Sequence, residues 1–326
     1  MKALLKELTG TPGPAGHEEA VRALIRREVE PLADELRVDA LGSLVARKRS
    51  LSKGQGGLRI LVASRMDEPG LIASHIDAQG RVRFAALGPL ERRSLAGSLV
   101  RFLNGQAGVV GCEAGAEALP ALDRFFVDVG SDRAADCPVK PGETAVLEVP
   151  FQELGGRVSA GALETRAGVA AAIETLRGLK SSPHELCFVF AAQGQVSANT
   201  LAAAAYALEP EIAITLEAAA TGEGIRLGGG PAVKMRAGYL LADPRLVEWM
   251  TAEAERRRLP FQRELGRAGG ENGIGVQSRG EGVPWSGLSI PVRYLHSPSE
   301  MLDLQDLDGM VRLLTALLRR PLRLGS

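Results

Sequence analysis

Residues 58–68 read LRILVASRMDE, an apolar run that stops abruptly at charged residues. Two later stretches have the same form, ELCFVFAA at 185–192 and EIAITLEA at 211–218, and WSGLSIPVRY at 285–294 resembles them. Strands that are apolar on both faces are typical of a mostly parallel sheet covered by helices on both sides. The sequence therefore predicts an α/β fold, built as a three-layer α/β/α sandwich.

Segments with helical spacing of apolar residues lie before, between and after these strands. They are 2–9, 17–30, 165–179, 197–208, 244–258, 273–279 and 304–319. Between 70 and 157 the pattern changes to short strand-like runs separated by Gly, Pro and charged turns, which indicates an inserted β-rich, barrel-like unit. We predict a split α/β domain at 1–69 and 158–326, with the insert at 70–157.

The composition excludes several classes of partner. Lys and Arg total 39 and Asp and Glu total 39, so no basic excess suggests nucleic-acid binding. No apolar run is long enough to predict a membrane span, and the first residues lack the pattern of a signal peptide. Three widely spaced cysteines argue against a disulfide framework or a thiolate zinc site. We expect a cytoplasmic protein with no nucleic-acid or membrane partner.

Polar side chains follow the predicted strands where a ligand site is expected. In open α/β sheets, ligands bind at the carboxyl ends of the strands. Arg65, Gln195, Glu217 and His296 stand at such ends, and Glu164 opens the helix that follows the insert. These five side chains are expected to converge.

Longer motifs link these positions to a known family. They are TPGPAGHEE at 11–19, RVDALGSLVARK at 37–48, ELGGRVSAGAL at 153–163, FVFAAQ at 188–193 and IPVRYLHSPSEMLDLQDL at 290–307. Over essentially the whole chain, the sequence resembles the tetrahedral or glutamyl aminopeptidases, peptidase family M42 of the co-catalytic zinc exopeptidases. The resemblance implies a hydrolase fold in which two zinc or cobalt ions activate water, and an insert that mediates oligomer contacts.

The family's metal and catalytic positions can be carried over from the motifs. The metal ligands would fall on Arg65, Glu164, Gln195, Glu217 and His296, the general base on Gly194, and the residue that orients the first ligand on Asp67. Of the ligand positions, only Glu164, Glu217 and His296 could bind metal, because a guanidinium has no lone pair to offer. Two lost carboxylates and one gained cation make the site about three charge units less attractive to a metal ion.

These departures imply a pseudoenzyme whose zinc site is lost, with no cofactor and at most one weakly bound metal ion. We expect Arg65 to take the metal's place and to pair with Glu164 or Glu217. The chain would then act by binding peptides in the old cleft, or by assembly as a homo-oligomer or a mixed oligomer with an active paralogue.

Two other readings remain open. The first is an active aminopeptidase with a remodelled single-metal site made by His296, Glu164 and Glu217. The second is an enzyme of another class that reuses the cleft, for which the sequence offers no positive motif. A glycosidase pair of Glu164 and Glu217 has no support elsewhere in the sequence.

Overall fold

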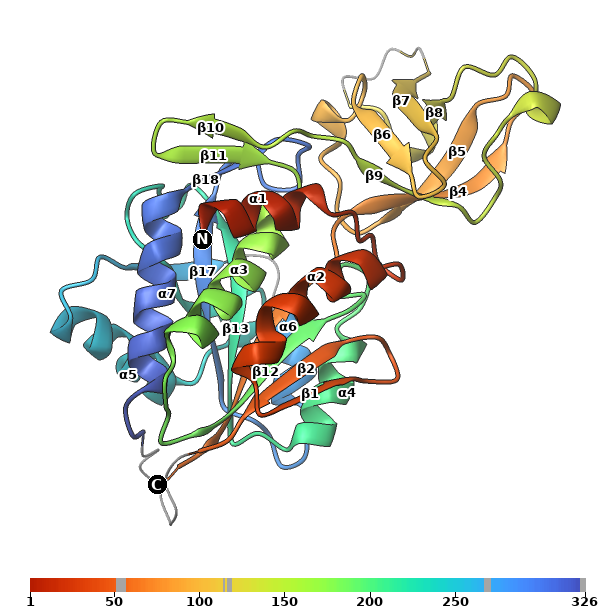
Figure 1. The fold of residues 1–326 in the computed structure, drawn as a ribbon. Helices are drawn as coiled ribbons and strands as arrows, with labels where there is room; N and C mark the ends of the chain where they lie inside the picture. Colours follow the sequence, from red (N-terminus) through yellow and green to blue (C-terminus); the bar gives the residue numbers. More distant parts are fainter. Residues whose placement is uncertain (51–56, 114, 116–118, 267–270, 323–326) are drawn as a thin grey trace.

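The computed structural model describes residues 1–50, 57–113, 115, 119–266 and 271–322. Within them, a nine-stranded sheet runs through the molecule in the order β1-β2-β12-β3-β13-β17-β14-β15, and β16 pairs with β14 (Figure 1). Its strands are β1 (Glu35–Val38), β2 (Leu44–Lys48), β3 (Arg59–Arg65), β12 (Glu185–Ala191), β13 (Ile212–Ala220), β14 (Ala232–Ala237), β15 (Leu240–Leu241), β16 (Gln262–Gly266) and β17 (Trp285–Val292). The central strands β12, β3, β13 and β17 are mutually parallel.

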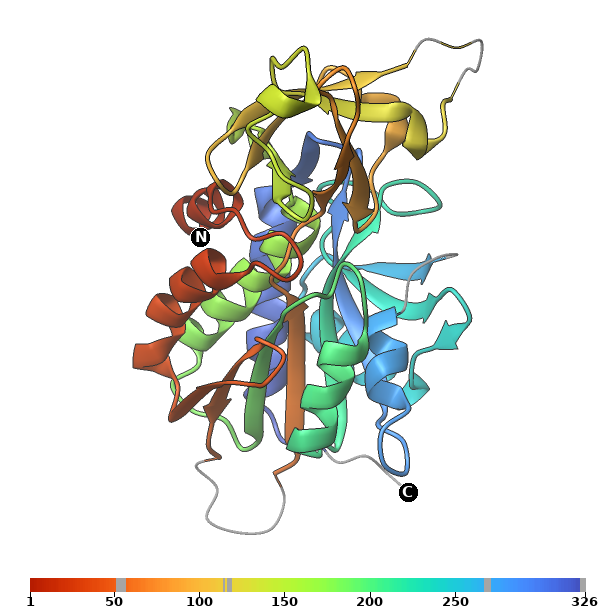
Figure 2. The same ribbon diagram turned by 90° about the vertical axis from the view of Figure 1, so that its right-hand side faces the viewer.

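Helices cover both faces of this sheet, as predicted. One face carries α1 (Lys2–Gly10), α2 (Glu19–Val29), α3 (Leu163–Gly178), α5 (Pro244–Arg256) and α7 (Leu304–Leu318). The other carries α4 (Asn199–Leu208) and α6 (Glu271–Gln277), which lie together to the right of the strands in Figure 2, opposite α1, α2 and α3. The three-layer α/β/α architecture is therefore confirmed.

The strand β3 shows why its sequence is apolar throughout. Ile60 and Val62 point into the core beneath α3 and α7, whereas Leu61 and Ala63 point into the core beneath α4. Successive side chains alternate between the faces of a strand, so a strand buried on both sides needs apolar residues at every position.

The insert forms a closed barrel that stands apart from the sheet (Figure 1). Its strands are β4 (Gly70–Ile76), β5 (Val82–Leu87), β6 (Leu99–Phe102), β7 (Ala107–Cys112), β8 (Phe125–Asp128) and β9 (Thr144–Leu147). The barrel has a small apolar core of its own, which supports the predicted barrel-like unit. The division of the chain at 69/70 and 157/158 into domains stays a prediction.

Several strands were not expected from the sequence. A three-stranded sheet joins β10 (Gln152–Leu154), β11 (Arg157–Ala160) and β18 (Glu300–Asp303). The strands β14 and β16 are interrupted by charged residues, so they lack the apolar run that identified the central strands. In the described ranges, no helix combines the length and the apolar character that crossing a bilayer requires.

Candidate functional site

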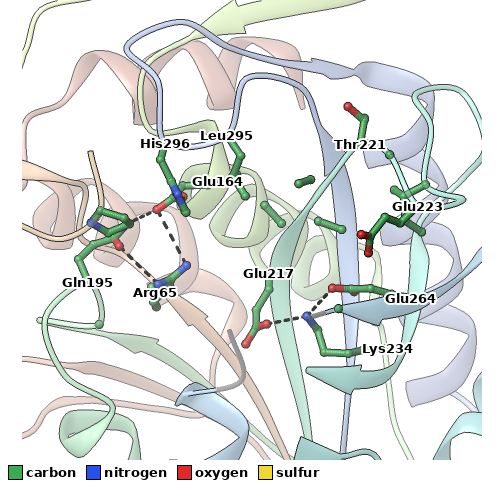
Figure 3. Close-up of a pocket in the computed structure, with 18 of the residues that line it drawn as sticks. Arg65, Glu164, Gln195, Glu217, Thr221, Glu223, Lys234, Glu264, Leu295 and His296 are labelled. Carbon is green, nitrogen blue, oxygen red and sulfur yellow. Dashed lines mark hydrogen bonds and ion pairs between the residues drawn. The ribbon is translucent and has the colours of Figure 1, made fainter. Parts of the chain in front are cut away.

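A pocket of about 730 Å³ opens where the central parallel strands end (Figure 3). Six of the positions singled out from the sequence line it: Arg65, Glu164, Gly194, Gln195, Glu217 and His296. Asp67 is fully buried outside this lining. The strand-end argument therefore located the pocket, and the parallel order of β12, β3 and β13 is the reason these distant residues meet.

Glu164, near the start of α3, is the centre of one polar cluster. An Arg65 guanidinium nitrogen lies 4.0 Å from Glu164 Oε1, and His296 Nε2 lies 3.1 Å from Glu164 Oε2. The side-chain amide of Gln195 donates a hydrogen bond to Glu164, and Arg65 Nη1 donates to Gln195 Oε1 at 3.4 Å. The buried carboxylate of Glu164 is thus surrounded by donors on three sides (Figure 3).

The electrostatics of this cluster favour a charged Glu164. Burial by itself would raise the pKa of Glu164, because it disfavours the charged form. The hydrogen bond from His296 and the charge of Arg65 outweigh burial and hold the pKa of Glu164 below its usual value. Glu164 is therefore an anion whose charge is balanced by the neighbouring Arg65 guanidinium.

Glu300, which the site prediction did not include, holds two members of the cluster in place. Its Oε2 accepts the backbone N–H of Glu164 at 2.8 Å, and its Oε1 accepts the backbone N–H of His296 at 2.8 Å. Burial and the neighbouring Glu164 charge raise the pKa of Glu300 well above its usual value. Its place in the HSPSEM segment, four residues after His296, was the only sequence signal for it.

Asp67 fixes the loop that follows β12. Its carboxylate accepts the backbone N–H groups of Gly194 at 3.0 Å and of Gln195 at 2.7 Å. Burial raises the pKa of Asp67 to about 6, although these hydrogen bonds and the charge of Arg65 act in the opposite direction. Asp67 therefore positions a loop in this chain, which has no histidine at position 65 for it to orient.

Gly194 leaves the space through which the Arg65 side chain runs. A Cβ atom added at Gly194 would lie 2.5 Å from Arg65 Cγ and 2.7 Å from Arg65 Cδ. Contacts that short do not occur between real side chains without a shift of one of them. The Arg65 side chain can therefore take this path only because residue 194 has no side chain.

A second charged cluster lines another part of the same pocket. Lys234 Nζ lies 3.0 Å from Glu217 Oε2 and 2.8 Å from Glu264 Oε1. Burial would lower the pKa of Lys234, but the two carboxylates outweigh it and raise that pKa above its ordinary value. Lys234 and Glu264 were missed from the sequence; a lone lysine after the apolar residues 231–233 was the available signal.

Several non-glycine residues in or beside the pocket have left-handed backbone conformations, including Glu223 of its lining, whose φ is 49°. The φ angles are 57° at Ala162, 53° at Gln193 and 66° at His296. Such conformations cost of order 1–3 kcal/mol each and persist only where the surrounding structure imposes them. The backbone around the pocket therefore keeps a shape that the isolated chain would not prefer.

The residues at this site do not fit a two-zinc centre. In the described part of the chain, no three or more His, Cys, Asp or Glu side chains are grouped so that they could hold a metal ion. Arginine and glutamine stand at two of the five positions that the family resemblance assigns to ligands, and Glu217 is ion-paired with Lys234. Zinc needs imidazole, thiolate or carboxylate ligands, and a nearby fixed cation opposes its binding.

Comparison with known proteins finds similarity to a family of aminopeptidases. The sequence profile described as M42 glutamyl aminopeptidase matches residues 42–313. A protein of Acetivibrio thermocellus that bears an aminopeptidase name is 34% identical over 322 residues, covering 95% of this chain and 96% of that protein. The lysyl aminopeptidase of Pyrococcus furiosus is 27% identical over 339 residues, covering 97% of this chain and 96% of that enzyme.

Solved structures agree with the sequence comparison. An aminopeptidase from Desulfurococcus kamchatkensis superposes with a TM-score of 0.92 at 30% identity, covering 98% of this chain and 94% of the other. The TET1 peptidase of Pyrococcus horikoshii, described as able to assemble into a tetrahedron or a large octahedral shell, gives a TM-score of 0.88 at 29% identity. That match covers 97% of this chain and 98% of the peptidase.

Proposed function

This chain belongs to the M42 glutamyl aminopeptidase family, and from that premise we propose that it is a catalytically silent member whose two-metal centre has been dismantled. It keeps the fold and the cleft of a hydrolase and acts by binding or assembly. The observation that carries the proposal is the Arg65 side chain, which lies between Gln195 and Glu164 in the pocket. A guanidinium stays protonated at any ordinary pH and cannot ligate a metal ion.

The proposal is also supported by the loss of a base. The family's general base would stand at residue 194, which is a glycine, and the adjacent ligand position holds the neutral amide of Gln195. Hydrolysis at a metal centre needs a group that takes the proton of the attacking water. Two carboxylates that remain in the pocket already accept from other side chains, Glu164 from His296 and Glu217 from Lys234.

The cleft keeps features that suit an extended peptide. In the described chain, β13 is paired on both edges only as far as Leu216, opposite Ser64 of β3. Residues 218–220 pair with β17 alone and line the pocket. An exposed strand edge binds peptide by main-chain hydrogen bonds. We propose that peptides bind here and leave intact.

The barrel suits a role in assembly with further copies of this chain or with an active paralogue. Leu99 of β6 and Val109 of β7 are cross-strand partners, and their side chains are 54% and 44% exposed. Adjacent exposed apolar side chains are a feature of protein interfaces. The related TET1 peptidase is described as assembling into a tetrahedron or an octahedral shell, which motivates a homo-oligomer here.

Two measurements on the unaltered chain test the proposal. Protein purified in the presence of excess zinc is analysed for metal content, and aminoacyl chromogenic substrates are assayed with added zinc or cobalt. We expect less than one tightly bound metal ion per chain and no turnover above background. A normal turnover number would refute the silent-member proposal. One bound zinc with measurable turnover would favour the single-metal aminopeptidase instead.

Restoring the family's residues tests whether only the chemistry is lost. We expect binding of one metal ion beside Glu164, with some hydrolysis, to return in the triple variant Arg65→His, Gly194→Glu, Gln195→Glu. The matched control keeps Arg65 and carries only Gly194→Glu and Gln195→Glu. This control should remain inactive, because the cation persists and the new side chain at 194 collides with it. Equal activity in both variants would show that Arg65 does not block the site.

A further inference from the structure

The side chain of Lys234 reaches across a neighbouring strand to enter the pocket. In the sheet, β17 lies between β14, which carries Lys234, and β13, which carries Glu217. Lys234 is opposite Gly287 of β17, and Gly287 is opposite Thr215 of β13. Adjacent strands are about 4.8 Å apart, so the lysine must extend over the position of Gly287 to reach β13.

Gly287 is what makes this crossing possible. A Cβ atom at Gly287 would lie 2.9 Å from Thr215 Oγ1 and 3.3 Å from Lys234 Cε. The missing side chain therefore leaves a passage along the sheet surface for the methylene groups of Lys234. The ammonium group ends between Glu217 and Glu264, and Glu264 is the register partner of Lys234 in β16.

Because this ion cluster is buried, removing one of its charges is strongly destabilising. The side chains of Lys234, Glu217 and Glu264 are 4%, 10% and 9% exposed. A buried carboxylate that loses its cation is strongly destabilised, because water no longer solvates the charge. Two carboxylates this close consequently require a positive charge between them, supplied here by the chain itself.

We propose that Lys234 is a second built-in cation, which fills the space that a metal ion would otherwise take against Glu217. The inference rests on the proposed function and adds to it a residue outside the family's ligand positions. Arg65 neutralises the half of the cleft that contains Glu164, and Lys234 neutralises the half that contains Glu217. Each half of the former centre therefore excludes metal independently.

Polar atoms on the same face of the sheet as Glu217 show what the removal of Lys234 would leave. Glu264 Oε2 and Ser289 Oγ are buried and have no hydrogen-bond partner among the described residues. Ser289 is opposite Glu217 in β17, and it lies on the same face of the sheet because register partners share a face. Two carboxylates and a hydroxyl are oxygen ligands of the kind that Mn²⁺ and Mg²⁺ prefer.

The test replaces Lys234 by methionine, which is uncharged and ends one atom short of the ammonium position. The full chain is titrated with Mn²⁺, and binding is followed by electron paramagnetic resonance and by thermal unfolding. We expect Lys234→Met to bind Mn²⁺ at least about tenfold more tightly than the unaltered chain. Added Mn²⁺ should raise the unfolding temperature of the variant only. The double variant Lys234→Met, Glu264→Gln should lose the gained site.

Three further variants make the result decisive. Any Mn²⁺ binding gained by Arg65→Met should be unchanged when Glu264→Gln is added, because Lys234 still occupies the space beside Glu217. Lys180→Met, at an exposed position, controls for the loss of one positive charge. Lys234→Gln replaces Lys234→Met if the methionine variant does not fold. No gain of Mn²⁺ binding on removal of Lys234, or a gain that Glu264→Gln leaves unchanged, would overturn the inference.

This outcome is separate from that of the proposed function. The Mn²⁺ titration uses no substrate, so it reports on the Lys234 position even if the unaltered chain proves to hydrolyse peptides. Conversely, an inactive chain in which Lys234→Met gains no site would leave the silent-member proposal intact and remove only this inference.

Discussion

At the scale of single residues, the site is defined by side chains whose sizes and charges fit one another. Arg65 fills space that a side chain at 194 would need, and its charge lies beside the Glu164 carboxylate. The neutral Gln195 both donates to Glu164 and accepts from Arg65. A change at one of these positions is therefore expected to alter the cost of a change at another.

Gly194 and Arg65 provide the direct test of this coupling. We expect Gly194→Ala to cost about 1–3 kcal/mol of unfolding free energy, because the added methyl group overpacks against Arg65. In an Arg65→Ala background the same change should cost less than about 0.5 kcal/mol. Urea unfolding of the four proteins gives the coupling energy.

The control for this cycle is Gly156→Ala, since a Cβ atom there would have no neighbour within 4 Å. That change should leave the stability nearly unaltered in both backgrounds. A purely additive cycle for Gly194 and Arg65 would mean that the two side chains do not compete for space.

At the scale of elements, a charged cluster ties the end of α5 to the segment that follows α7. Glu253 of α5 accepts hydrogen bonds from Arg256, Arg257 and Arg320, at 2.6–3.0 Å. Burial opposes the charged form of Glu253, but the three guanidinium groups outweigh it and lower its pKa to about 2. Because α5 and α7 pack side by side on the sheet, this carboxylate links two helices of one layer.

The low pKa of Glu253 predicts a pH-dependent stability. Its folded pKa lies below the ordinary value of 4.5, so its contribution is complete above pH 4.5 and is lost as the pH falls toward 2. Glu253→Gln should destabilise the protein by on the order of 2 kcal/mol at pH 7, after allowance for solvent around the arginines. Denaturant unfolding at pH 7 and pH 3 should show a smaller difference at pH 3.

Glu148→Gln serves as the control for this experiment, because Glu148 pairs with Arg101 at an exposed position. Its effect should be small at both pH values. A destabilisation by Glu253→Gln that is the same at pH 7 and pH 3 would argue against an ionic role for Glu253.

At the scale of the whole molecule, the barrel projects from the body that carries the pocket (Figure 2). The barrel has its own apolar core, and its outer surface carries the exposed pair Leu99 and Val109. We propose that this projecting unit joins copies of the chain through its exposed apolar residues.

The assembly proposal predicts a specific effect of charge on the barrel. Light scattering coupled to size-exclusion chromatography should show an oligomer for the unaltered chain. Leu99→Glu combined with Val109→Glu should shift it to smaller species, because burying two unpaired carboxylates in an interface is costly. The control is Leu154→Glu, which is 50% exposed on β10 outside the barrel. A monomeric unaltered chain, or equal dissociation by the control, would count against the barrel contact.

The sequence alone determined the layers of the fold and the edge on which the pocket lies. Apolar runs such as 58–64 and 185–192 predicted strands buried on both faces, and their charged or polar ends placed Arg65 and Gln195 at one edge. Both inferences depend on local periodicity and on the direction of parallel strands. The residue type at position 65 also has a chemical consequence that needs no structure, because the guanidinium of an arginine cannot bind a metal ion.

Only the tertiary structure decided which charges pair. Lys234 meets Glu217 and Glu264 because of strand order, register and the missing side chain at Gly287. Glu300 accepts from two backbone groups because β18 pairs with β11, which leads directly into α3. Such partners are chosen by the packing of the whole chain, in which buried charges must find each other, and no local pattern in the sequence records that choice.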